Sequence, residues 1–199
     1  SATTSDGFIA RTDGTCRWIT GEQARRVGHR LRAEMGCVLV GRVTVENDDP
    51  QLTARIEGVV NQPLRVVLDP NARLPNSFRV FSAGGATVRF LKPGLATEQY
   101  DVEVQTGPDG FDLKSVLAHL FERGVIGVLV EGGGETAAPF LKRGLVDRLE
   151  KFTSPKAFGS GRPWLGASAP EISLEKLAEE QLGDDLHESF RVVYGTISS

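Results

Sequence analysis

Several kinds of residue are scarce in this chain of 199 residues, and each scarcity excludes a class of protein. Two cysteines, Cys16 and Cys37, are too few for a disulfide scaffold or a tetrahedral thiolate site, so we expect a reducing, cytoplasmic location. The 23 basic residues do not exceed the 26 acidic ones, and the net charge of −3 gives no sign of a nucleic-acid partner. The longest apolar runs are far too short to span a membrane.

Histidine is also scarce, and the three histidines, His29, His119 and His187, lie far apart in the sequence, so we expect no metal site. No signal-peptide pattern opens the chain. The length fits a single domain over residues 1–199. Because the first residues run without a Met straight into the turn-forming Ser5-Asp6-Gly7, we expect that a first strand or an upstream domain is missing from this chain.

The hydrophobic pattern predicts alternating strands and helices. Apolar runs between turn residues predict strands at 37–41, 64–68, 79–81, 87–91, 102–104, 125–130, 147–153 and 189–197. Amphipathic segments predict helices at 112–122 and 135–142, and a third from a capping box at Thr20 and Gln23 to about Glu34. This alternation is typical of an α/β sheet flanked by helices. The long loop at 159–170 predicts an antiparallel final connection and therefore a mixed sheet.

The most distinctive local pattern is Glu131-Gly132-Gly133-Gly134, between a buried strand and a helix. Glycines there let backbone N–H groups approach a phosphate, and the helix N-terminus adds a positive dipole. Gly132, Gly134 and Ala137 match G-x-G-x-x-A. Unlike an ordinary dinucleotide-binding fold, however, the motif lies late in the chain and no acidic residue ends the next strand. Tight packing of strand against helix is the alternative. Because a phosphate would repel Glu131, we expect its carboxylate to face another ligand group.

Two further segments carry candidate chemistry. Gly41-Arg42-Val43-Thr44 follows a strand and can hold a phosphate through a backbone N–H, a guanidinium and a hydroxyl, although a plain strand-to-helix turn fits equally. The paired carboxylates of Asp48-Asp49-Pro50 fit acid–base chemistry, metal binding or the end of a helix. Arg32 and Arg55 are suited to bidentate capture of a phosphate, although either alone is typical of a solvated surface.

Two residues before the first helix have open interpretations. Trp18 either covers a cofactor or packs in the core. Cys16 has no His near it in the sequence, so a nucleophilic role is poorly supported.

Together these segments resemble the riboflavin-biosynthesis pyrimidine reductase family over essentially the whole chain. The matching segments are Ser5-Asp6-Gly7, Trp18-Ile19-Thr20, Arg32-Ala33, Val40-Gly41 with Thr44, Asp48-Asp49-Pro50 with Leu52-Thr53 and Arg55, Arg65-Val66-Val67-Leu68-Asp69, Val130-Glu131-Gly132-Gly133, and Gly144-Leu145-Val146-Asp147 with Pro155. The resemblance implies a dihydrofolate-reductase-like fold, a three-layer α/β/α sandwich with a mixed, mostly parallel sheet. It also implies an NADPH-dependent oxidoreductase that converts 5-amino-6-(5-phosphoribosylamino)uracil to 5-amino-6-(5-phosphoribitylamino)uracil by hydride transfer to ribose C1′.

The resemblance also implies roles for individual positions. It places the cofactor at Ala2, Trp18, Gly41, Arg42, Thr44, Asp48, Gly132, Gly133, Gly134, Glu135 and Thr136. It places the substrate at Cys16, Arg32, Leu52, Arg55 and Glu131, with the two arginines at its 5′-phosphate and Glu131 at pyrimidine or ribityl groups. We predict Arg42 for the 2′-phosphate of the cofactor. Asp48 is the hypothesis for the catalytic proton donor, a role that needs a raised pKa.

The chain departs from the family pattern in ways that leave alternatives open. The family usually has a Ser where Cys16 stands, and a thiol is a poorer hydrogen-bond donor. The H-x-E and P-C-x-x-C motifs of zinc deaminases are missing, so we expect no deamination by this chain. The alternatives are a same-fold reductase of the undeaminated diaminopyrimidine or of a pterin-like ring, and a non-catalytic nucleotide-binding module. The sequence does not separate NADPH from NADH. We also predict a homodimer, because open edge strands need to be covered.

Overall fold

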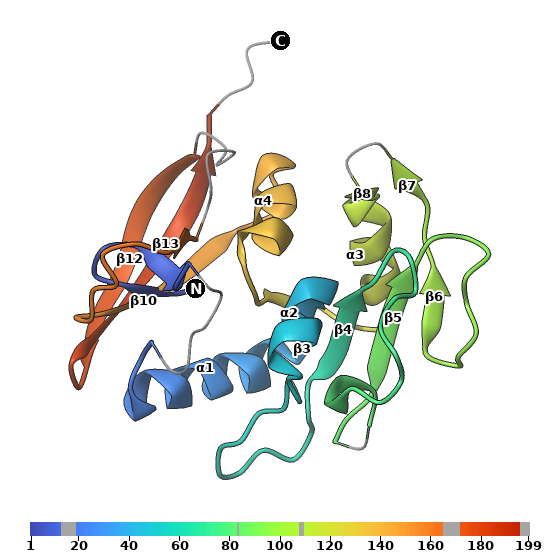
Figure 1. Ribbon diagram of the computed structural model, residues 1–199, viewed down its shortest axis with the longest axis horizontal. Coiled ribbons are helices and arrows are strands. Elements are labelled where there is room, and N and C mark those ends of the chain that lie inside the picture. The colour runs from blue at the N-terminus through green and yellow to red at the C-terminus, as the bar shows by residue number, and fades with distance from the viewer. Residues whose placement is uncertain (13–18, 83, 108–109, 165–171, 196–199) are drawn as a thin grey trace. The chain divides into compact units, whose positions relative to one another are not determined.

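The computed structural model describes residues 1–12, 19–82, 84–107, 110–164 and 172–195. Its contacts divide the chain into two compact units. The first unit is formed by Ser1–Val27 with Gly133–Ser199, and the second by Gly28–Gly132. Helix α1 (Glu22–Met35) begins in the first unit and ends in the second, and each unit has a sheet of its own (Figure 1).

The second unit is built on a five-stranded parallel sheet in the order β6-β5-β4-β3-β9 (Figure 1). Its strands are β3 (Cys37–Gly41), β4 (Leu64–Leu68), β5 (Thr87–Leu91), β6 (Asp101–Glu103) and β9 (Leu129–Val130). The other elements of this unit are α2 (Arg42–Asp48), the 3₁₀ turn η1 (Arg79–Phe81), the paired β7 (Thr106–Gly107) and β8 (Gly110–Phe111), and α3 (Leu113–Glu122). The three central strands, β3, β4 and β5, are largely apolar and buried because both faces of the sheet are covered, with Arg65 and Arg89 as buried charged exceptions.

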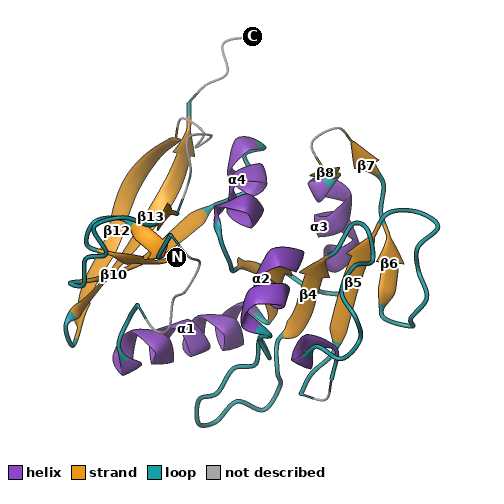
Figure 2. Cartoon of the chain, in the orientation of Figure 1, coloured by secondary structure: helices purple, strands orange, loops and turns teal. Residues whose placement is uncertain are grey.

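Helices lie on both faces of this parallel sheet (Figure 2). On one face Val45 of α2 packs in a core with Val67 of β4. On the other face His119 of α3 meets the ring of Phe90 edge-on, with the ring centroids 5.7 Å apart. Phe90 pairs with Leu68, the residue after Val67, and successive residues of a strand point to opposite faces. The second unit therefore has the predicted helix–sheet–helix layers, and the predicted α/β class is confirmed.

The first unit holds a four-stranded sheet in the order β1-β10-β13-β12 (Figure 1). Strand β1 (Ala2–Thr4) is parallel to β10 (Arg148–Ser154), whereas β13 (Asp185–Tyr194) is antiparallel both to β10 and to β12 (Ile172–Leu182). A small sheet joins β2 (Phe8–Ala10) to β11 (Arg162–Pro163), and helix α4 (Gly134–Lys142) follows the glycine run. The predicted antiparallel final connection is therefore confirmed.

The Ser5-Asp6-Gly7 turn has a structural role in the first unit. The carboxylate of Asp6 accepts hydrogen bonds from the hydroxyl of Thr4 and from the backbone N–H groups of Phe158 and Gly159. These bonds, led by the one from Thr4, hold the pKa of Asp6 below its usual value. The turn thereby fastens the chain after β1 to the loop that follows β10.

The first helix begins one residue later than the capping box predicts. Helix α1 starts at Glu22, so Gly21 is its N-cap, and the Gly21 carbonyl accepts from the N–H of Arg25. The Gly21 N–H donates to the carboxylate of Asp185 at 2.6 Å. The prediction that Thr20 is the N-cap is therefore wrong, and the Asp185 carboxylate, distant in sequence, accepts the bond from the N-cap N–H that the capping box assigns to the N3 side chain.

Two of the predicted strands are also wrong in part. Residues 79–81 form the 3₁₀ turn η1, which continues from Phe78. Of residues 125–130, only Leu129 and Val130 pair as a strand, and Ile126 is 94% exposed. The remaining predicted strands and helices are present with shifts of a few residues at their ends. Strand β12 was not predicted.

Candidate functional site

The order of strands in the parallel sheet marks one position for a ligand. From β3 the chain adds β4, β5 and β6 on one side, whereas β9 pairs with the other side of β3. Open parallel sheets bind ligands outside the carboxyl ends of the strands where the strand order reverses. The residues that follow the carboxyl ends of β3 and β9 are Arg42 and Glu131, which begin the two phosphate-type segments found in the sequence.

The two segments meet at Gly132 and Thr44. Gly132 has a φ of +110°, a conformation that side chains rarely adopt. A Cβ atom added to Gly132 would lie 2.5 Å from the Thr44 Oγ1, which is closer than real Cβ contacts. Glycine is therefore required here both by the backbone angle and by the close approach of α2.

Arg32 and Glu131 form a bidentate ion pair at this edge of the sheet. The Nε and Nη2 of Arg32 donate to the two carboxylate oxygens of Glu131, each at 2.7 Å. The side chains are 19% and 26% exposed, so water reaches the pair. The Nη1 of Arg32 donates to the carbonyl of Thr53 at 3.1 Å. Three of the five N–H groups of this guanidinium are thus already used.

Arg55 lies beside the same group of residues but has no carboxylate partner among the described residues. Its Nη2 lies 3.5 Å from the Nε2 of His29, and its Nη1 makes a long contact of 3.5 Å with Gln51. The Nδ1 of His29 lies 3.1 Å from the Thr53 carbonyl, which also accepts from Arg32. Arg55 is therefore an exposed cation whose guanidinium donors make only long contacts among the described residues and are available to an anion.

The structure separates the two adjacent aspartates. Asp49 ends α2 in the left-handed conformation, with a φ of 39°, and its carboxylate accepts from the backbone N–H of Arg79 at 2.7 Å and the Arg79 Nε at 3.1 Å. Asp48 has no hydrogen bond or ion pair with the described residues. Although its surface is exposed, desolvation by neighbouring protein atoms raises the pKa of Asp48. Asp49 thus has the helix-end role, and Asp48 remains free for chemistry.

Two other predicted residues of this unit also have clear surroundings. Leu52 is 2% exposed and has a φ of 55°, an unusual backbone conformation for a leucine and one that clusters at functional sites. Arg42 begins α2 after Gly41 and pairs with Glu46 one turn later. Any anion at Arg42 therefore competes with a neighbouring carboxylate.

Other predicted positions belong to the first unit. Ala2 lies in β1 opposite Phe152, and Gly133 is the N-cap of α4, which includes Gly134, Glu135 and Thr136. No side chain caps this helix, so the first N–H groups of α4 are not blocked by a side-chain acceptor. Cys16 and Trp18 lie outside the described residues. Within the described parts of the chain, no group of three His, Cys, Asp or Glu side chains could hold a metal ion, and no helix is long and apolar enough to cross a membrane.

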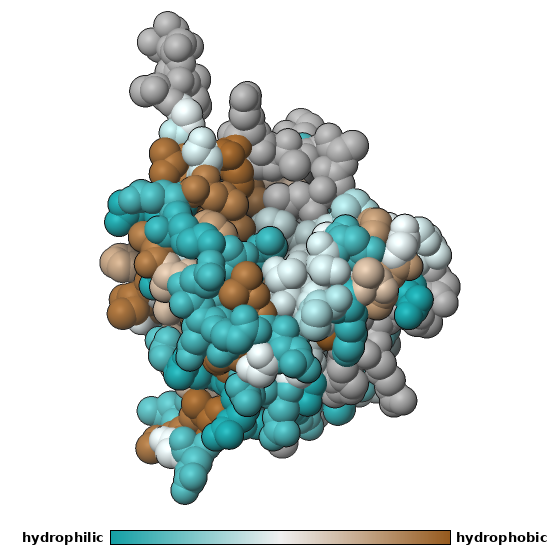
Figure 3. Space-filling view, turned by 90° about the vertical axis from the view of Figure 1, so that its left-hand side faces the viewer, coloured by the Kyte–Doolittle hydropathy of each residue, from teal (hydrophilic) through white to brown (hydrophobic). Residues whose placement is uncertain are grey.

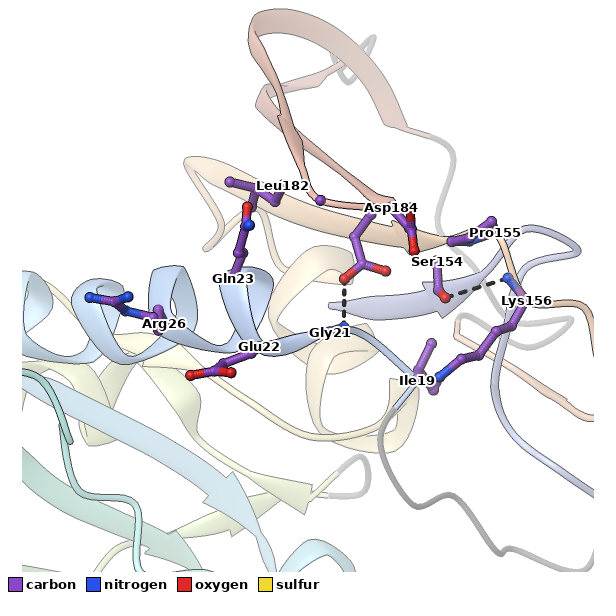
Figure 4. A pocket seen from close by; sticks show the side chains of 12 residues that line it. Ile19, Gly21, Glu22, Gln23, Arg26, Ser154, Pro155, Lys156, Leu182 and Asp184 are labelled. Carbon is purple, nitrogen blue, oxygen red and sulfur yellow. Dashed lines mark hydrogen bonds between the residues drawn. The ribbon is translucent and has the colours of Figure 1, made fainter.

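The first unit also has a cavity of about 540 Å³ at the start of α1 (Figure 4). Its walls come from α1, the end of β10 and the β12–β13 turn. The Asp185 carboxylate accepts from the Gly21 N–H, and the Ser154 hydroxyl accepts from the Lys156 N–H at 3.4 Å (Figure 4). Among the predicted site residues that the structure describes, none lines this cavity.

The sequence analysis missed His29 and the carbonyl of Thr53. His29 precedes Arg32 by three residues, and helical residues at that spacing share a face, so the pair was detectable once Arg32 was singled out. The role of the Thr53 carbonyl was not detectable, because any residue type supplies a carbonyl and only the fold directs it.

Comparison with known proteins gives the family. A family model described as the RibD C-terminal domain matches residues 1–187. The riboflavin biosynthesis protein RibD of Aquifex aeolicus is 38% identical over 195 residues, covering 93% of this chain and 54% of that protein. RibD of Bacillus amyloliquefaciens is 34% identical over 180 residues, covering 86% and 47%. The chain thus spans about half the length of these curated relatives.

Solved structures agree with this match. A Thermotoga maritima protein described as a diaminohydroxyphosphoribosylaminopyrimidine deaminase/5-amino-6-(5-phosphoribosylamino)uracil reductase has a TM-score of 0.81 at 31% identity, covering 96% of this chain and 54% of that one. Dihydrofolate reductase from Enterococcus faecalis, complexed with NADP(H), has a TM-score of 0.52 at 16% identity, covering 96% and 92%, a likeness that concerns the fold alone. The predicted dihydrofolate-reductase-like fold is therefore confirmed, and the chain belongs to the RibD C-terminal domain family.

Proposed function

We propose that this chain reduces 5-amino-6-(5-phosphoribosylamino)uracil to its ribitylamino counterpart with NADPH in riboflavin biosynthesis. Membership of the RibD C-terminal domain family supports a reductase of this pathway. The observation that carries the assignment is a cluster of charged side chains suited to this substrate. In it Arg32 pairs with Glu131, and Arg55 lies beside them with donors available to a ligand. This group lies at the sheet edge where strand order reverses.

The phosphate end of the substrate is assigned to Arg55. Arg32 also faces this region, but its donors are largely used by Glu131 and Thr53. Arg55 has no competing carboxylate among the described residues, and a guanidinium binds a phosphate with two parallel hydrogen bonds. Arg32 is then suited to hold Glu131 in place rather than to be the main phosphate ligand.

The pyrimidine or ribityl end is assigned to Glu131. A carboxylate held on both oxygens by Arg32 still has lone pairs for N–H or O–H donors of a ligand. Its fixed orientation reduces the entropy cost of binding such a ligand. Leu52 and the position of Cys16 complete the proposed substrate residues.

The proposed cofactor residues fit a dinucleotide in two respects. The Gly132 Cα approaches Thr44 so closely that no side chain fits between them, and the amides at the start of α4 have no side-chain cap. The proposed cofactor contacts are Gly41, Arg42, Thr44, Ala2, Trp18 and the residues from Gly132 to Thr136. When bound, the nicotinamide would supply hydride to C1′ of the opened ribose.

Asp48 is the proposed proton donor. A carboxylic acid donates a proton only while it is protonated, and desolvation raises the pKa of Asp48 in the direction that this role needs. We expect Asp48→Asn to lower kcat about 100-fold or more, with a smaller change in the KM for NADPH. Normal turnover with only the cofactor affinity changed would exclude the catalytic role.

The test of the activity is NADPH oxidation followed by absorbance, with the phosphoribosylamino-uracil and its undeaminated diamino analogue offered separately. Turnover of the uracil compound alone supports the proposal. Turnover of the diamino compound alone favours the alternative reductase that acts before deamination. If neither turns over while NADPH binds, the chain as it stands is a nucleotide-binding module or acts on another ring. NADH in place of NADPH tests the cofactor preference.

A homodimer and a cytoplasmic location belong to the same proposal. Strand β12 is an edge strand of eleven residues, and hydrophobic residues of β12 and β13 are exposed, namely Leu174 at 43%, Leu177 at 44% and Val193 at 41%. In Figure 3 hydrophobic residues interrupt a largely hydrophilic surface on this side. A second copy would cover such an edge. Sedimentation of a monomer at micromolar concentration would contradict the dimer.

A further inference from the structure

His29 is a titratable group in the candidate site to which the proposed reaction assigns no role. It lies on α1, half-buried, one turn before Arg32. Its Nδ1 is 3.1 Å from the Thr53 carbonyl, and a carbonyl only accepts, so Nδ1 carries the hydrogen in this contact. The Arg55 backbone N–H lies 3.3 Å from the same nitrogen, a longer contact than the one with Thr53. The other ring nitrogen, Nε2, faces the Arg55 Nη2 at 3.5 Å.

The surroundings of His29 keep the ring neutral. Burial lowers its pKa most, and the positive charges of Arg32 and Arg55 lower it further. The bond to Thr53 and the negative charge of Glu131 act in the opposite direction and are outweighed. Because the charge of Glu131 neutralises that of Arg32, the cluster of His29, Arg32, Arg55 and Glu131 carries one net positive charge, which lies on Arg55.

We propose that His29 is a second ligand of the substrate phosphate, so that a phosphomonoester dianion on Arg55 also accepts a hydrogen bond from Nε2 of His29, which takes up one proton from solvent on binding. The substrate class rests on the proposed function, whereas the proton uptake rests on the geometry of the cations. No other reactant is needed, because the proton adds to the free lone pair of Nε2.

The physical reason is that the bound dianion reverses the sign of the electrostatic potential at Nε2 of His29. A lone pair on Nε2 would repel a phosphate oxygen, whereas an N–H at the same place donates to it. A dianion next to the ring changes the net charge around it from +1 to −1, so the added proton is attracted instead of repelled. The thermodynamic consequence is mutual: anion binding raises the pKa of His29, and protonation tightens anion binding by the same factor.

The chain contains a matched control pair. On α3 the Nε of Arg123 donates to the Nε2 of His119 at 2.9 Å, and burial and Arg123 lower the pKa of His119. This pair has a single arginine and lies beside Glu122, which has the opposite effect on the pKa. Sulfate that merely accumulates at any His–Arg pair would change both histidines.

The experiment is an NMR titration of the three histidines from pH 5 to 9, in sodium chloride and in sodium sulfate at equal ionic strength. Sulfate is a dianion throughout this range, so its own titration does not interfere. We expect the pKa of His29 to rise by about one unit or more in sulfate, with that of His119 unchanged. By linkage, sulfate binds about tenfold more tightly to the protonated form. Ribose 5-phosphate then tests the organic ligand.

Two variants make the result specific. Arg55→Met is expected to raise the pKa of His29 without sulfate, because one repelling charge is removed, and to abolish the response to sulfate. His29→Gln keeps a donor for the Thr53 carbonyl but does not titrate, so sulfate binding becomes independent of pH. His119→Gln is the matched control and should behave like the original protein.

The outcomes separate this inference from the proposed reaction. If NADPH oxidation with the phosphorylated pyrimidine is normal but the pKa of His29 ignores both sulfate and ribose 5-phosphate, the inference is wrong and the reaction stands. Equal shifts of His29 and His119 also overturn it. If the pKa of His29 rises alone but no pyrimidine is reduced, the anion site stands and the proposed reaction fails.

Discussion

Two arginine–carboxylate pairs in the parallel-sheet unit have nearly the same geometry and very different surroundings. Arg89 donates through Nε and Nη2 to both oxygens of Asp101, at 2.7 and 2.9 Å, as Arg32 does to Glu131 at 2.7 Å each. In both pairs Nη1 donates to a backbone carbonyl at 3.1 Å. The side chains of the first pair are 3% and 0% exposed, and those of the second 19% and 26%.

The difference in exposure separates a pair that is covered by protein from a pair that is open to a ligand. Arg89 is covered by the rings of Phe81 and Tyr100, with its guanidinium carbon 5.3 and 5.4 Å from their centroids. The Oδ2 of Asp101 also accepts from the backbone N–H groups of Thr97 and Glu98, so four N–H groups hold this carboxylate. Near Arg32 and Glu131, in contrast, an open arginine and a titratable histidine remain. The same ion-pair chemistry is therefore closed off by protein around Arg89 and accessible to a ligand around Arg32, which is the basis of the substrate role proposed for the second pair.

The largest expected effect comes from breaking the buried pair. Arg89→Met leaves the Asp101 carboxylate buried without its cation, and we expect a loss of about 3–5 kcal/mol in the free energy of unfolding, measured by urea denaturation. The double variant with Asp101→Leu should recover a large part of this loss, because no uncompensated charge remains. A loss from Arg89→Met no greater than that from Arg32→Met would remove the distinction between the pairs.

The same pair predicts the direction of a pH effect. Burial opposes ionisation of Asp101, but the bonds from Arg89 and from the amides of Thr97 and Glu98 outweigh it and hold the pKa below its usual value. A lowered native pKa stabilises the fold above the unfolded pKa and loses this contribution as the pH falls through the native one. The stability gap between the original protein and the Arg89→Met/Asp101→Leu variant should therefore shrink below about pH 4.

A smaller effect is expected from a substitution that shifts the partly exposed Arg32–Glu131 pair without changing either residue. Gly132→Ala puts a Cβ 2.5 Å from the Thr44 Oγ1, so the backbone after Glu131 must shift. Gly124→Ala is the matched control, with a φ of +81° and open space around the added Cβ. We expect Gly132→Ala to cost about 1–3 kcal/mol more stability than the control and to weaken NADPH binding. Equal costs would mean that α2 moves away freely.

Removal of the partly exposed Arg32 should affect activity more than the free energy of unfolding. We expect Arg32→Met to lower kcat/KM for the pyrimidine about 10- to 100-fold, while the free energy of unfolding falls by less than about 1 kcal/mol. Arg30→Met on the same helix is the control, because the one ion pair of Arg30 with a described residue is the distant one with Glu34 at 3.8 Å. A large loss of stability with an unchanged KM would assign this pair to the structure instead.

The elements that the sequence predicted well are those with a local cause. Helix α3 has both its apolar stripe and its cap, since the Asp112 side chain accepts from the Lys114 N–H. Strands β3 and β4 are buried on both faces and are read as apolar runs. The turn at Gly132 was predicted from the glycine run between a strand and a helix, and the structure adds the reason that glycine stands there, its φ and its contact with Thr44.

The elements that the sequence did not predict depend on distant partners. Strand β12 carries the helix-favouring segment Leu174–Gln181, and it is extended because β13 pairs along its length. Ile126 belongs to an apolar run yet is exposed, because pairing with β3 begins only at Leu129. The ion pair of Arg32 was missed for the same reason: Glu131 lies 99 residues further along the chain, and the sheet alone brings them together.

The smallest expected effect concerns a third arginine–carboxylate pair, Arg42 with Glu46 on α2, whose side chains are 28% and 36% exposed. An i,i+4 pair of this exposure contributes no more than about 0.5 kcal/mol, so Glu46→Gln should hardly change stability. If Arg42 holds the 2′-phosphate of the cofactor, releasing it from Glu46 should raise the preference for NADPH over NADH by a few-fold, and Arg42→Gln should lower it. Kd values for both cofactors measure this ratio. A ratio unchanged in both variants would leave Arg42 as a surface residue and restrict the ligand-binding pair to Arg32 and Glu131.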